Sequence, residues 1–446
     1  MNESQLEHLE KIRQQYDWLP YPYIPIDRSA RNDCIGLYFH NLVTSYYIRN
    51  QKVIETEGKL ILDAGCGSGY KTLVLAEANP GAKVVGIDLS EKSLQVAKER
   101  LEYHHIKNFE FHQIALDEVP NLGLEFDYIN CDEVIYMLPD SLAGLKALKA
   151  VLKPDGILRA NLHSSLQRAN FYRAREFATL LGLMDRNPED LEIELLKEVM
   201  NSLKNSVDLK QKTWTSQIQK DPKGALMNHF IQGDKGSTIP EMFDLLDQAE
   251  LEFISMLNWR QWDLMDLFQN PDDLPAFLAM SLPGLSLEEK HRFFELLHPV
   301  HRLFDFWCGH PNTAHFSIPV AEWSLEDWKT ATAYLHPQLK VPETQEKMLE
   351  AMTKFQAFLI SKYLLIPGLS EVWIDSALLN CIVPLWDAPQ SVLSLAQRWH
   401  QLRPVDPVNL QPLQFEEALE TVTQMLTTMA DFGYVLVECD RSVPDR

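Results

Sequence analysis

The feature that most constrains the fold is an alternation of short apolar runs with helical segments over residues 59–163. Five runs have the length and composition of strands: Lys59–Ala64, Lys83–Asp88, Phe109–Ile114, Phe126–Cys131 and Gly156–His163. Three segments between them repeat apolar residues every three or four positions, as helices do: Tyr70–Ala78, Glu91–Tyr103 and Ser141–Leu152. Strands joined by crossover helices run parallel and are covered on both faces. We therefore predict an α/β fold with a doubly wound, mostly parallel sheet.

The rest of the chain predicts additions to this sheet. Residues 165–235 and 262–310 are mostly helical in pattern, and Ala314–Val320 has the composition of one more strand. The first 50 residues are rich in aromatic side chains, which predicts an arm that packs on the core or closes over a ligand as a lid. The expected domains are an N-terminal arm or lid (1–50), an α/β domain with two helical insertions (51–323) and a mainly helical domain for recognition or regulation (324–446).

Charge and composition narrow the class of partner. The 446 residues include 41 Lys and Arg against 63 Asp and Glu, a net charge of −22, which argues against nucleic acid as a partner. The N-terminus lacks the basic and apolar regions of a signal peptide, and no apolar run approaches the ~18 residues of a membrane span. The six cysteines are scattered without a CxxC pair. Together these features predict a soluble, cytoplasmic protein with free thiols and no membrane partner.

One segment carries the main functional signal: LILDAGCGSGY at residues 60–70. A strand ends at Asp63, and glycines follow at positions 65, 67 and 69 before a helix begins. A dinucleotide site needs G-x-G-x-x-G, so this G-x-G-x-G spacing disfavours NAD. Asp63 would repel a pyrophosphate but suits a ligand with an amino group and a sulfonium. Asp88, at the end of the next strand, is placed to accept hydrogen bonds from both hydroxyls of a ribose.

With these residues the sequence resembles the class I S-adenosylmethionine-dependent methyltransferases, which have a Rossmann-like fold. The specific motifs are LDAGCGSG, followed by VVGIDLS, and VLKPDGIL at 151–158. The match runs from about Lys59 to His163, with looser similarity to about residue 323. The resemblance implies a transferase that catalyses methylation with S-adenosyl-L-methionine (SAM) as cofactor.

The resemblance also implies a set of SAM-binding positions. Asp63, the glycines and Cys66 would hold the methionine part, Asp88 the ribose, and Leu89 would lie against the adenine. Many relatives carry an acidic residue after the third strand, where this chain has Ala115 and Leu116, with Asp117 next. The full predicted set is Asp63, Gly65, Cys66, Gly67, Gly69, Asp88, Leu89, Ala115, Leu116 and Cys131.

The methyl acceptor should meet SAM at the carboxyl ends of the strands, beyond strands four and five. Methyl transfer from a sulfonium depends mainly on proximity and alignment, and a base is needed only if the acceptor must lose a proton. His163 and Glu133 are the candidate bases, and Tyr136 stands where many small-molecule relatives carry histidine. The alternative roles are structural: a strand-end histidine bonded to backbone, and a carboxylate at a helix N-terminus.

A histidine-rich segment offers a weaker signal. Residues 291–315 contain five histidines and Cys308, and the spacing of His298, His301, Cys308 and His310 permits a zinc site. Pro299 and the surrounding apolar and aromatic residues favour packing and hydrogen-bonding roles instead. We predict no metal.

The sequence motifs do not identify the methyl acceptor. A compact small-molecule methyltransferase needs only about 250 residues, by comparison with ordinary domain sizes, and this chain exceeds that by roughly 200. Such extensions favour a large acceptor, and we predict an N or O atom of a protein side chain. The alternatives are a small metabolite enclosed by the insertions and a SAM-binding regulator that no longer catalyses.

Overall fold

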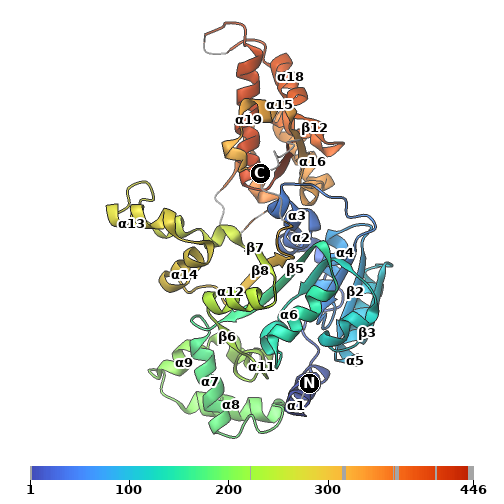
Figure 1. Cartoon of the computed structure of the whole chain (residues 1–446), viewed down its shortest axis with the longest axis vertical. Helices are drawn as coiled ribbons and strands as arrows, with labels where there is room; N and C mark the ends of the chain where they lie inside the picture. The colour runs from blue at the N-terminus through green and yellow to red at the C-terminus, as the bar shows by residue number, and fades with distance from the viewer. Residues whose placement is uncertain are drawn as a thin grey trace. The chain divides into compact units, whose positions relative to one another are not determined.

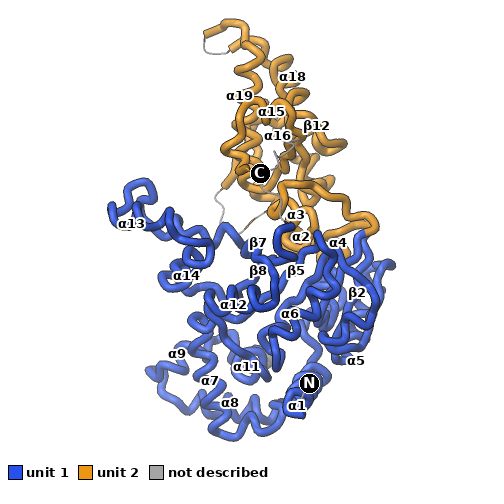
Figure 2. Tube along the Cα trace, in the orientation of Figure 1, with its two compact units in different colours: residues 1–28, 59–73, 82–313 blue, residues 29–58, 74–81, 314–446 orange. Residues whose placement is uncertain are grey.

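The computed structural model describes residues 3–220, 222–313, 318–364, 366, 371–406 and 409–439. The chain forms two compact units (Figure 2), a larger one of residues 1–28, 59–73 and 82–313 and a smaller one of residues 29–58, 74–81 and 314–446. The first 50 residues are thus shared between the units. The domain division expected from the sequence stays a prediction.

The larger unit is built on one mixed sheet (Figure 1). Its strands are β1 (Leu60–Ala64), β2 (Lys83–Asp88), β3 (Phe109–Gln113), β4 (Phe126–Cys131), β5 (Leu152–Ser164), β6 (Gly236–Ser237), β7 (Glu252–Met256) and β8 (Leu303–Gly309). The order is β3-β2-β1-β4-β5-β8-β7, and β6 pairs with β5. Strands β1 to β6 pair in parallel, whereas β8 is antiparallel to both of its neighbours. The predicted α/β fold with a mostly parallel sheet is confirmed.

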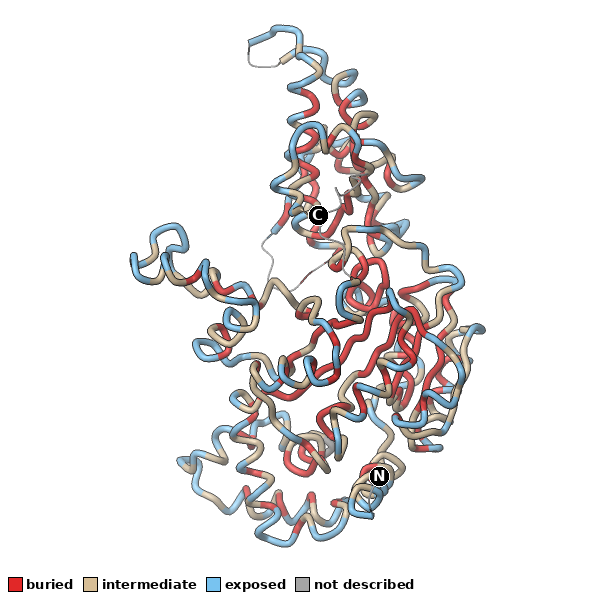
Figure 3. The backbone as a smooth tube through the Cα atoms, viewed as in Figure 1, coloured by how far each residue is buried: buried red, intermediate tan, exposed pale blue. Residues whose placement is uncertain are grey.

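Helices cover both faces of this sheet. Successive side chains of a strand point to opposite faces, and Ile61 and Leu62 of β1 are both completely buried. Leu62 belongs to a core that includes Leu145 of α6 (Ser141–Ala150) and Leu246 of α12 (Ile239–Gln248). The buried strands form the continuous red centre of this unit in Figure 3. Burial on both faces explains why these strands are nearly continuous apolar runs in the sequence.

The other helices of the larger unit lie entirely within it, except that the helix Tyr70–Ala78 continues into the smaller unit from Val74 onward. They are α1 (Glu3–Trp18), α4 (Tyr70–Ala78), α5 (Glu91–Tyr103), α7 (Ala169–Leu180), α8 (Asp190–Ser202), α9 (Asp208–Thr213), α10 (Ser216–Lys220), α11 (Pro222–His229), α13 (Ala276–Ser281) and α14 (Leu287–Leu297). Ser90 caps α5, with its Oγ accepting the Ser93 N–H at 3.0 Å. Helices α7 to α11 surround a separate small core that contains Trp214 and Phe230.

One predicted strand is wrong. Of Ala314–Val320, residues 314–317 lie outside the described residues, 318 and 319 are not in a strand, and Val320 begins a 3₁₀ turn. The strand that completes the sheet is β8, inside the segment predicted to be helical. Asp305 interrupts its apolar run because its carboxylate pairs with Arg159 of β5 at 2.6 Å. A charged residue on a buried strand hid the strand pattern.

The smaller unit has its own antiparallel sheet in the order β12-β9-β13. Its elements are α2 (Cys34–His40), α3 (Leu42–Asn50), α15 (Leu325–Thr330), β9 (Thr332–Leu335), α16 (Pro342–Thr353), β10 (Phe358–Leu359), β11 (Trp373–Ile374), α17 (Leu379–Ile382), β12 (Gln390–Ser391), α18 (Val392–Leu402), α19 (Phe415–Asp431) and β13 (Val435–Glu438). Tyr47 of α3 fixes β13, because its hydroxyl donates to the Val437 carbonyl at 3.1 Å and accepts the Val437 N–H at 3.0 Å. Across the described parts of both units, no helix is both long and apolar enough to cross a membrane.

Candidate active site

The turn between β1 and α4 contains the three glycines of the sequence motif. Gly65, Gly67 and Gly69 all have positive φ, at 75°, 51° and 78°. A Cβ atom on Gly67 would lie 2.1 Å from the carbonyl oxygen of Tyr21, so only glycine fits there. The same carbonyl accepts the Ser68 N–H at 2.8 Å. The turn is therefore held against the N-terminal segment as well as against the sheet.

Asp88 ends β2 directly beside this turn. Its Oδ2 accepts the Gly67 N–H at 2.9 Å, and its Oδ1 accepts the Ser90 N–H at 2.8 Å. Burial raises the pKa of the Asp88 carboxyl, although the two backbone hydrogen bonds act in the opposite direction. Each carboxylate oxygen can accept more than one hydrogen bond. The group is thus fixed in orientation and keeps capacity for a ligand's hydroxyl groups.

A cavity of about 520 Å³ lies at the carboxyl ends of β1, β2 and β4. This volume falls within the range of small-ligand sites, about 300–1,000 Å³. Eight of the ten predicted SAM-binding residues line it: Asp63, Gly65, Cys66, Gly67, Asp88, Leu89, Ala115 and Leu116. Gly69 and Cys131 are not among the described lining residues. Gly69 shapes the turn by donating its N–H to the Cys66 carbonyl at 3.0 Å, and Cys131 is completely buried next to Asp132, which lines the cavity.

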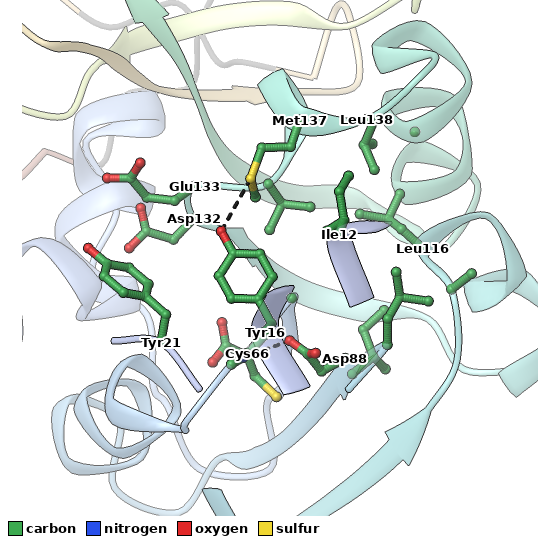
Figure 4. Close-up of a pocket in the computed structure, with 18 of the residues that line it drawn as sticks. Ile12, Tyr16, Tyr21, Cys66, Asp88, Leu116, Asp132, Glu133, Met137 and Leu138 are labelled. Carbon is green, nitrogen blue, oxygen red and sulfur yellow. Dashed lines mark hydrogen bonds between the residues drawn. The ribbon is translucent and has the colours of Figure 1, made fainter. Parts of the chain in front are cut away.

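Helix α1 forms a wall of the cavity, in the N-terminal segment predicted to be an arm or a lid, although the sequence did not predict a helix there. Ile12 and Tyr16 are among its lining residues, and the Tyr16 hydroxyl donates to the Met137 sulfur at 3.3 Å. Figure 4 shows the Tyr16 ring between two ends of the cavity. We call the end with Asp88 and Leu116 the donor end, and the end with Tyr21, Asp132, Glu133, Arg302 and Asp305 the acceptor end. The polar sequence of α1 lacks a clear apolar period, so no pattern indicated a helix.

Asp63 lies at the end of β1 with its side chain almost completely buried. Thr72 Oγ1 donates to its carboxylate at 2.6 Å, and Asn130 Nδ2 donates at 2.7 Å. Burial outweighs these hydrogen bonds and raises the pKa of Asp63 from 3.8 to about 6. The ionised form of this carboxyl is therefore available to a cationic ligand at neutral pH, and is lost in mild acid.

A buried cluster of charged side chains around Arg159 lies next to the acceptor end. The Arg159 side chain is only 3% exposed and pairs with Asp132 at 3.0 Å and with Asp305 at 2.6 Å. Its Nη1 also donates to Asn130 Oδ1 at 2.6 Å, which links it to the Asp63 network. The pKa of Arg159 stays well above its usual value, because the two carboxylates outweigh the cost of burial. Asp132 and Asp305 therefore share one buried cation, and Asp132 also pairs with Lys71 at 3.6 Å.

Glu133 follows β4 in a left-handed backbone conformation, with φ of 60°. Such a conformation is costly for a residue with a Cβ, and the Asn161 side chain stabilises it by accepting the Glu133 N–H at 2.8 Å. The carboxylate lines the cavity and accepts hydrogen bonds from the Tyr136 hydroxyl (2.5 Å) and from both terminal nitrogens of Arg302. Burial opposes ionisation of Glu133, but the hydrogen bonds and the positive charge of Arg302 favour it, and the pKa of Glu133 lies below its usual range. Glu133 is a fixed anion.

His163 and Tyr136 lie together behind Glu133 rather than in the described cavity lining. Their rings stack with centroids 3.8 Å apart, and His163 is completely buried. His163 Nε2 lies 2.8 Å from Arg302 Nη1, and Nδ1 lies 2.6 Å from Asp234 Oδ1. Because an arginine N–H can only donate, Nε2 is the acceptor and Nδ1 carries the proton that Asp234 receives. In this arrangement the lone pair of His163 is occupied.

Sequence reasoning missed Arg302 and Asp234. Arg302 comes directly before β8, which was not predicted as a strand, and β8 places Leu303 beside His163 of β5. Asp234 comes two residues before Gly236 of β6, which pairs with His163. Neither residue belongs to a local motif. A correct prediction of β6 and β8 would have placed both residues near the carboxyl end of β5.

The histidine-rich segment has other roles. His301 stacks on Trp262 with centroids 4.4 Å apart, and its Nε2 contacts the Gln261 carbonyl at 3.1 Å. His310 Nε2 contacts the Leu152 carbonyl at 3.0 Å. His315 lies outside the described residues. Within the described ranges, no three His, Cys, Asp or Glu side chains are grouped so that they can hold a metal ion.

Part of this chain is similar to known methyltransferases. Residues 55–241 match the family model described as a methyltransferase domain. The uncharacterized protein syc1184_c of Synechococcus sp. is 30% identical over 271 residues, which cover 60% of this chain and 63% of that protein. The ubiquinone biosynthesis O-methyltransferase of Actinobacillus pleuropneumoniae is 36% identical over 113 residues, which cover 24% of this chain and 47% of that enzyme. The chain thus spans less than two thirds of the length of these relatives.

A solved structure with the same fold is PKMT2 from Rickettsia typhi. It superposes with a TM-score of 0.55 and 17% identity, over 93% of this chain and 76% of that one. Its complex with AdoHcy gives a TM-score of 0.53 over 95% of this chain and 78% of that one. At this level of identity the likeness shows the fold.

The sheet order, the glycine turn beside Asp88 and the family match define the class of protein. Residues 55–241 belong to the class I S-adenosylmethionine-dependent methyltransferases. The cofactor of this family is SAM, and the lining residues fit it. The glycine turn permits close approach of backbone, Asp88 offers an oriented carboxylate, and Asp63 offers a negative charge for a cationic ligand.

Proposed function

We propose that the whole chain is a SAM-dependent methyltransferase whose acceptor is a side chain of another protein. At the donor end, Asp88 accepts hydrogen bonds from the ribose hydroxyls, Leu89 and Leu116 pack against the adenine, and the backbone of the glycine turn holds the methionine part. SAM supplies an electrophilic methyl group when bound. The residues of this chain supply alignment, which is the main requirement of an in-line displacement.

The main support for a protein acceptor is that the acceptor end of the cavity is open to solvent. The Arg302 side chain is 44% exposed and Tyr21 is 37% exposed, whereas Asp63 and Cys66 behind them are buried. A site for a free metabolite gains from excluding water around the whole substrate. An open end instead admits a side chain that stays attached to its own protein.

The surface beside Arg302 supports the same proposal. The segment from the end of α14 to Arg302 exposes Leu296, Leu297 and Val300. Exposed apolar residues near a site are a common feature of protein recognition, because their burial stabilises the complex. A docked protein would cover them while its side chain enters the cavity.

The charges at the acceptor end favour a nitrogen acceptor. A neutral amine gains a positive charge as it receives the methyl group, and Glu133, whose pKa is lowered, lines this end of the cavity and can stabilise that charge. Because its pKa is lowered, Glu133 is a poor base, so its proposed contribution is electrostatic. Tyr136 then holds the Glu133 carboxylate in place by donating its hydroxyl to it.

Methylation of a small metabolite is the second candidate. It is favoured by the similarity to ubiquinone biosynthesis O-methyltransferases and by a cavity of about 520 Å³. That similarity covers less than a quarter of this chain, so it carries little weight for the acceptor.

Incubation of the purified protein with methyl-labelled SAM and an extract of cells lacking it distinguishes these candidates. We expect label in one or a few protease-sensitive bands, and none with the Asp88→Ala variant. Label only in the small-molecule fraction would favour the metabolite. Absence of transfer despite SAM binding in calorimetry would favour a regulator that no longer catalyses.

A further inference from the structure

The ion pairs of Arg159 and of Arg302 at the acceptor end differ in how easily they open. Asp132 and Asp305 share Arg159, whose side chain is 3% exposed and has nowhere to move. Glu133 pairs with Arg302, whose side chain is 44% exposed. Separating a buried ion pair leaves an uncompensated charge, whereas a partly exposed arginine exchanges its partner for water. Of these two cations, only Arg302 can leave at low cost.

The backbone of Arg302 is held, because its carbonyl accepts the Ser164 N–H at 2.9 Å, so a displacement of Arg302 would move only its side chain. Between the end of α14 and β8, His298, Pro299 and Val300 are all exposed. The Glu133 side of the pair is different, because Glu133 is fixed through its N–H by Asn161 and through its carboxylate by Tyr136. If Arg302 moves away, the carboxylate stays where it is.

The Nη1 atom of Arg302 lies between His163 and Glu133. Nη1 lies 2.8 Å from His163 Nε2 and 3.1 Å from Glu133 Oε2. A nitrogen at this point touches both a carboxylate and the lone pair of an imidazole whose other nitrogen is held by Asp234 at 2.6 Å. That is the environment needed by a protonated amine that must give up a proton before it can attack.

We propose that Arg302 stands in for the methyl acceptor: an alkylammonium group, such as the end of a lysine side chain, displaces it and takes the position of Nη1 between Glu133 and His163. This inference rests on the proposed function. Displacement frees the lone pair of His163, so one N–H bond of the ammonium breaks and the proton moves to Nε2. The amine is left with the lone pair that forms the new N–CH₃ bond as the C–S bond breaks. Asp234 stabilises the resulting imidazolium, and His163 becomes a base only when the acceptor is in place.

The test measures binding of n-butylamine, which is protonated at neutral pH, to the full chain saturated with S-adenosylhomocysteine. If Arg302 covers Glu133 nine-tenths of the time, the apparent affinity of a competing cation falls about tenfold. Arg302→Gln should therefore bind n-butylamine about tenfold more tightly than wild type. Adding Glu133→Gln to that variant should abolish the gain, and neutral n-butanol should show no difference.

Arg292→Gln is the matched control. Arg292 is also partly exposed and pairs with a buried glutamate, Glu295, but it is not among the described residues that line the cavity. This variant should bind n-butylamine as wild type does. If Arg302→Gln loses S-adenosylhomocysteine binding, Arg302→Lys replaces it in the test. A smaller gain in n-butylamine affinity is then expected, because lysine still has a positive charge but cannot make the paired contact with Glu133.

Two results would overturn the proposal. One is an unchanged n-butylamine affinity in variants of Arg302 that still bind S-adenosylhomocysteine. The other is butyrate binding that is present in wild type and lost in Arg302→Gln, since Arg302 would then anchor an anion. Failure of wild type to bind S-adenosylhomocysteine would instead refute the proposed function, so the two failures are separable.

Discussion

The donor end and the acceptor end of the same cavity are built in opposite ways. The donor end comes mostly from one stretch of sequence, residues 60–90, with Leu116 as a later addition, and it is shaped by the glycine turn and by one carboxylate that the N–H groups of Gly67 and Ser90 orient. The acceptor end is assembled from side chains such as Glu133 and Arg302, with His163 and Asp234 behind them, and only the folded sheet brings these residues together. Because the two ends are built from different residues, mutations at one end should leave the function of the other end largely unchanged.

The largest expected effect is at the donor end. Asp88→Ala removes the acceptor of two backbone N–H groups and the expected partner of the ribose, so SAM affinity should fall about 100-fold, equal to about 2.7 kcal/mol. Titration calorimetry measures this change. Glu99→Ala, on the exposed side of α5, removes the same charge and should leave SAM affinity unchanged. Equal affinities for Asp88→Ala and Glu99→Ala would refute the ribose role.

The variant His163→Gln tests the acceptor end in the same way. We expect methyl transfer to slow by about 100-fold, the usual contribution of a positioned base. SAM affinity should stay within about twofold of wild type, because His163 contacts Arg302 and Asp234 rather than the donor end. Single-turnover assays with labelled SAM separate the two quantities. A parallel loss of SAM affinity would mean that the two ends are not separable.

The raised pKa of Asp63 predicts that SAM affinity depends on pH. SAM is cationic at sulfur, so it favours the ionised carboxyl, and the pKa of Asp63 is raised by burial from 3.8 to about 6. SAM affinity should fall about tenfold between pH 7 and pH 5, as Asp63 takes up its proton. Calorimetry between pH 5 and 8 measures this, and Asp63→Asn should flatten the profile. A flat profile in wild type would count against the assignment.

For folding without ligand the sign of the Asp63 effect is reversed. Between pH 3.8 and about 6 the native state binds the proton that the unfolded state has lost. The contribution of this group to stability therefore decreases as pH rises through that window. Chemical denaturation of wild type and Asp63→Asn at pH 4.5 and 7 should give the larger difference at pH 7.

The smallest expected effect concerns Tyr16, between the two ends. Tyr16→Ala removes a ring from the cavity wall, and the lost contact should weaken SAM binding about fivefold, equal to about 1 kcal/mol. Tyr16→Phe removes only the hydroxyl that donates to Met137 and should bind SAM nearly as wild type does. Wild-type affinity in Tyr16→Ala would indicate that α1 does not act as the lid expected of the N-terminal residues.

The contrast between the ends also explains what could be predicted from sequence. The strands β1, β2 and β4 and the position of Asp88 follow from apolar runs and glycine spacing, because those features are dictated locally by backbone geometry. Strand β8 was missed because Asp305 interrupts its apolar run, and the reason for that residue, Arg159, is far away in sequence. Arg302 and Asp234 were missed with it, since an ion pair leaves no periodic signal.

The central claim is that one cavity contains a SAM site that is independent of the side-chain network at its other end. The most direct measurement is a calorimetric titration of SAM into the wild-type chain, Asp88→Ala and His163→Gln under identical conditions. We predict one SAM bound with equal affinity by wild type and His163→Gln, and about 100-fold weaker binding by Asp88→Ala. No binding by wild type, or equal binding by all three proteins, would contradict the account.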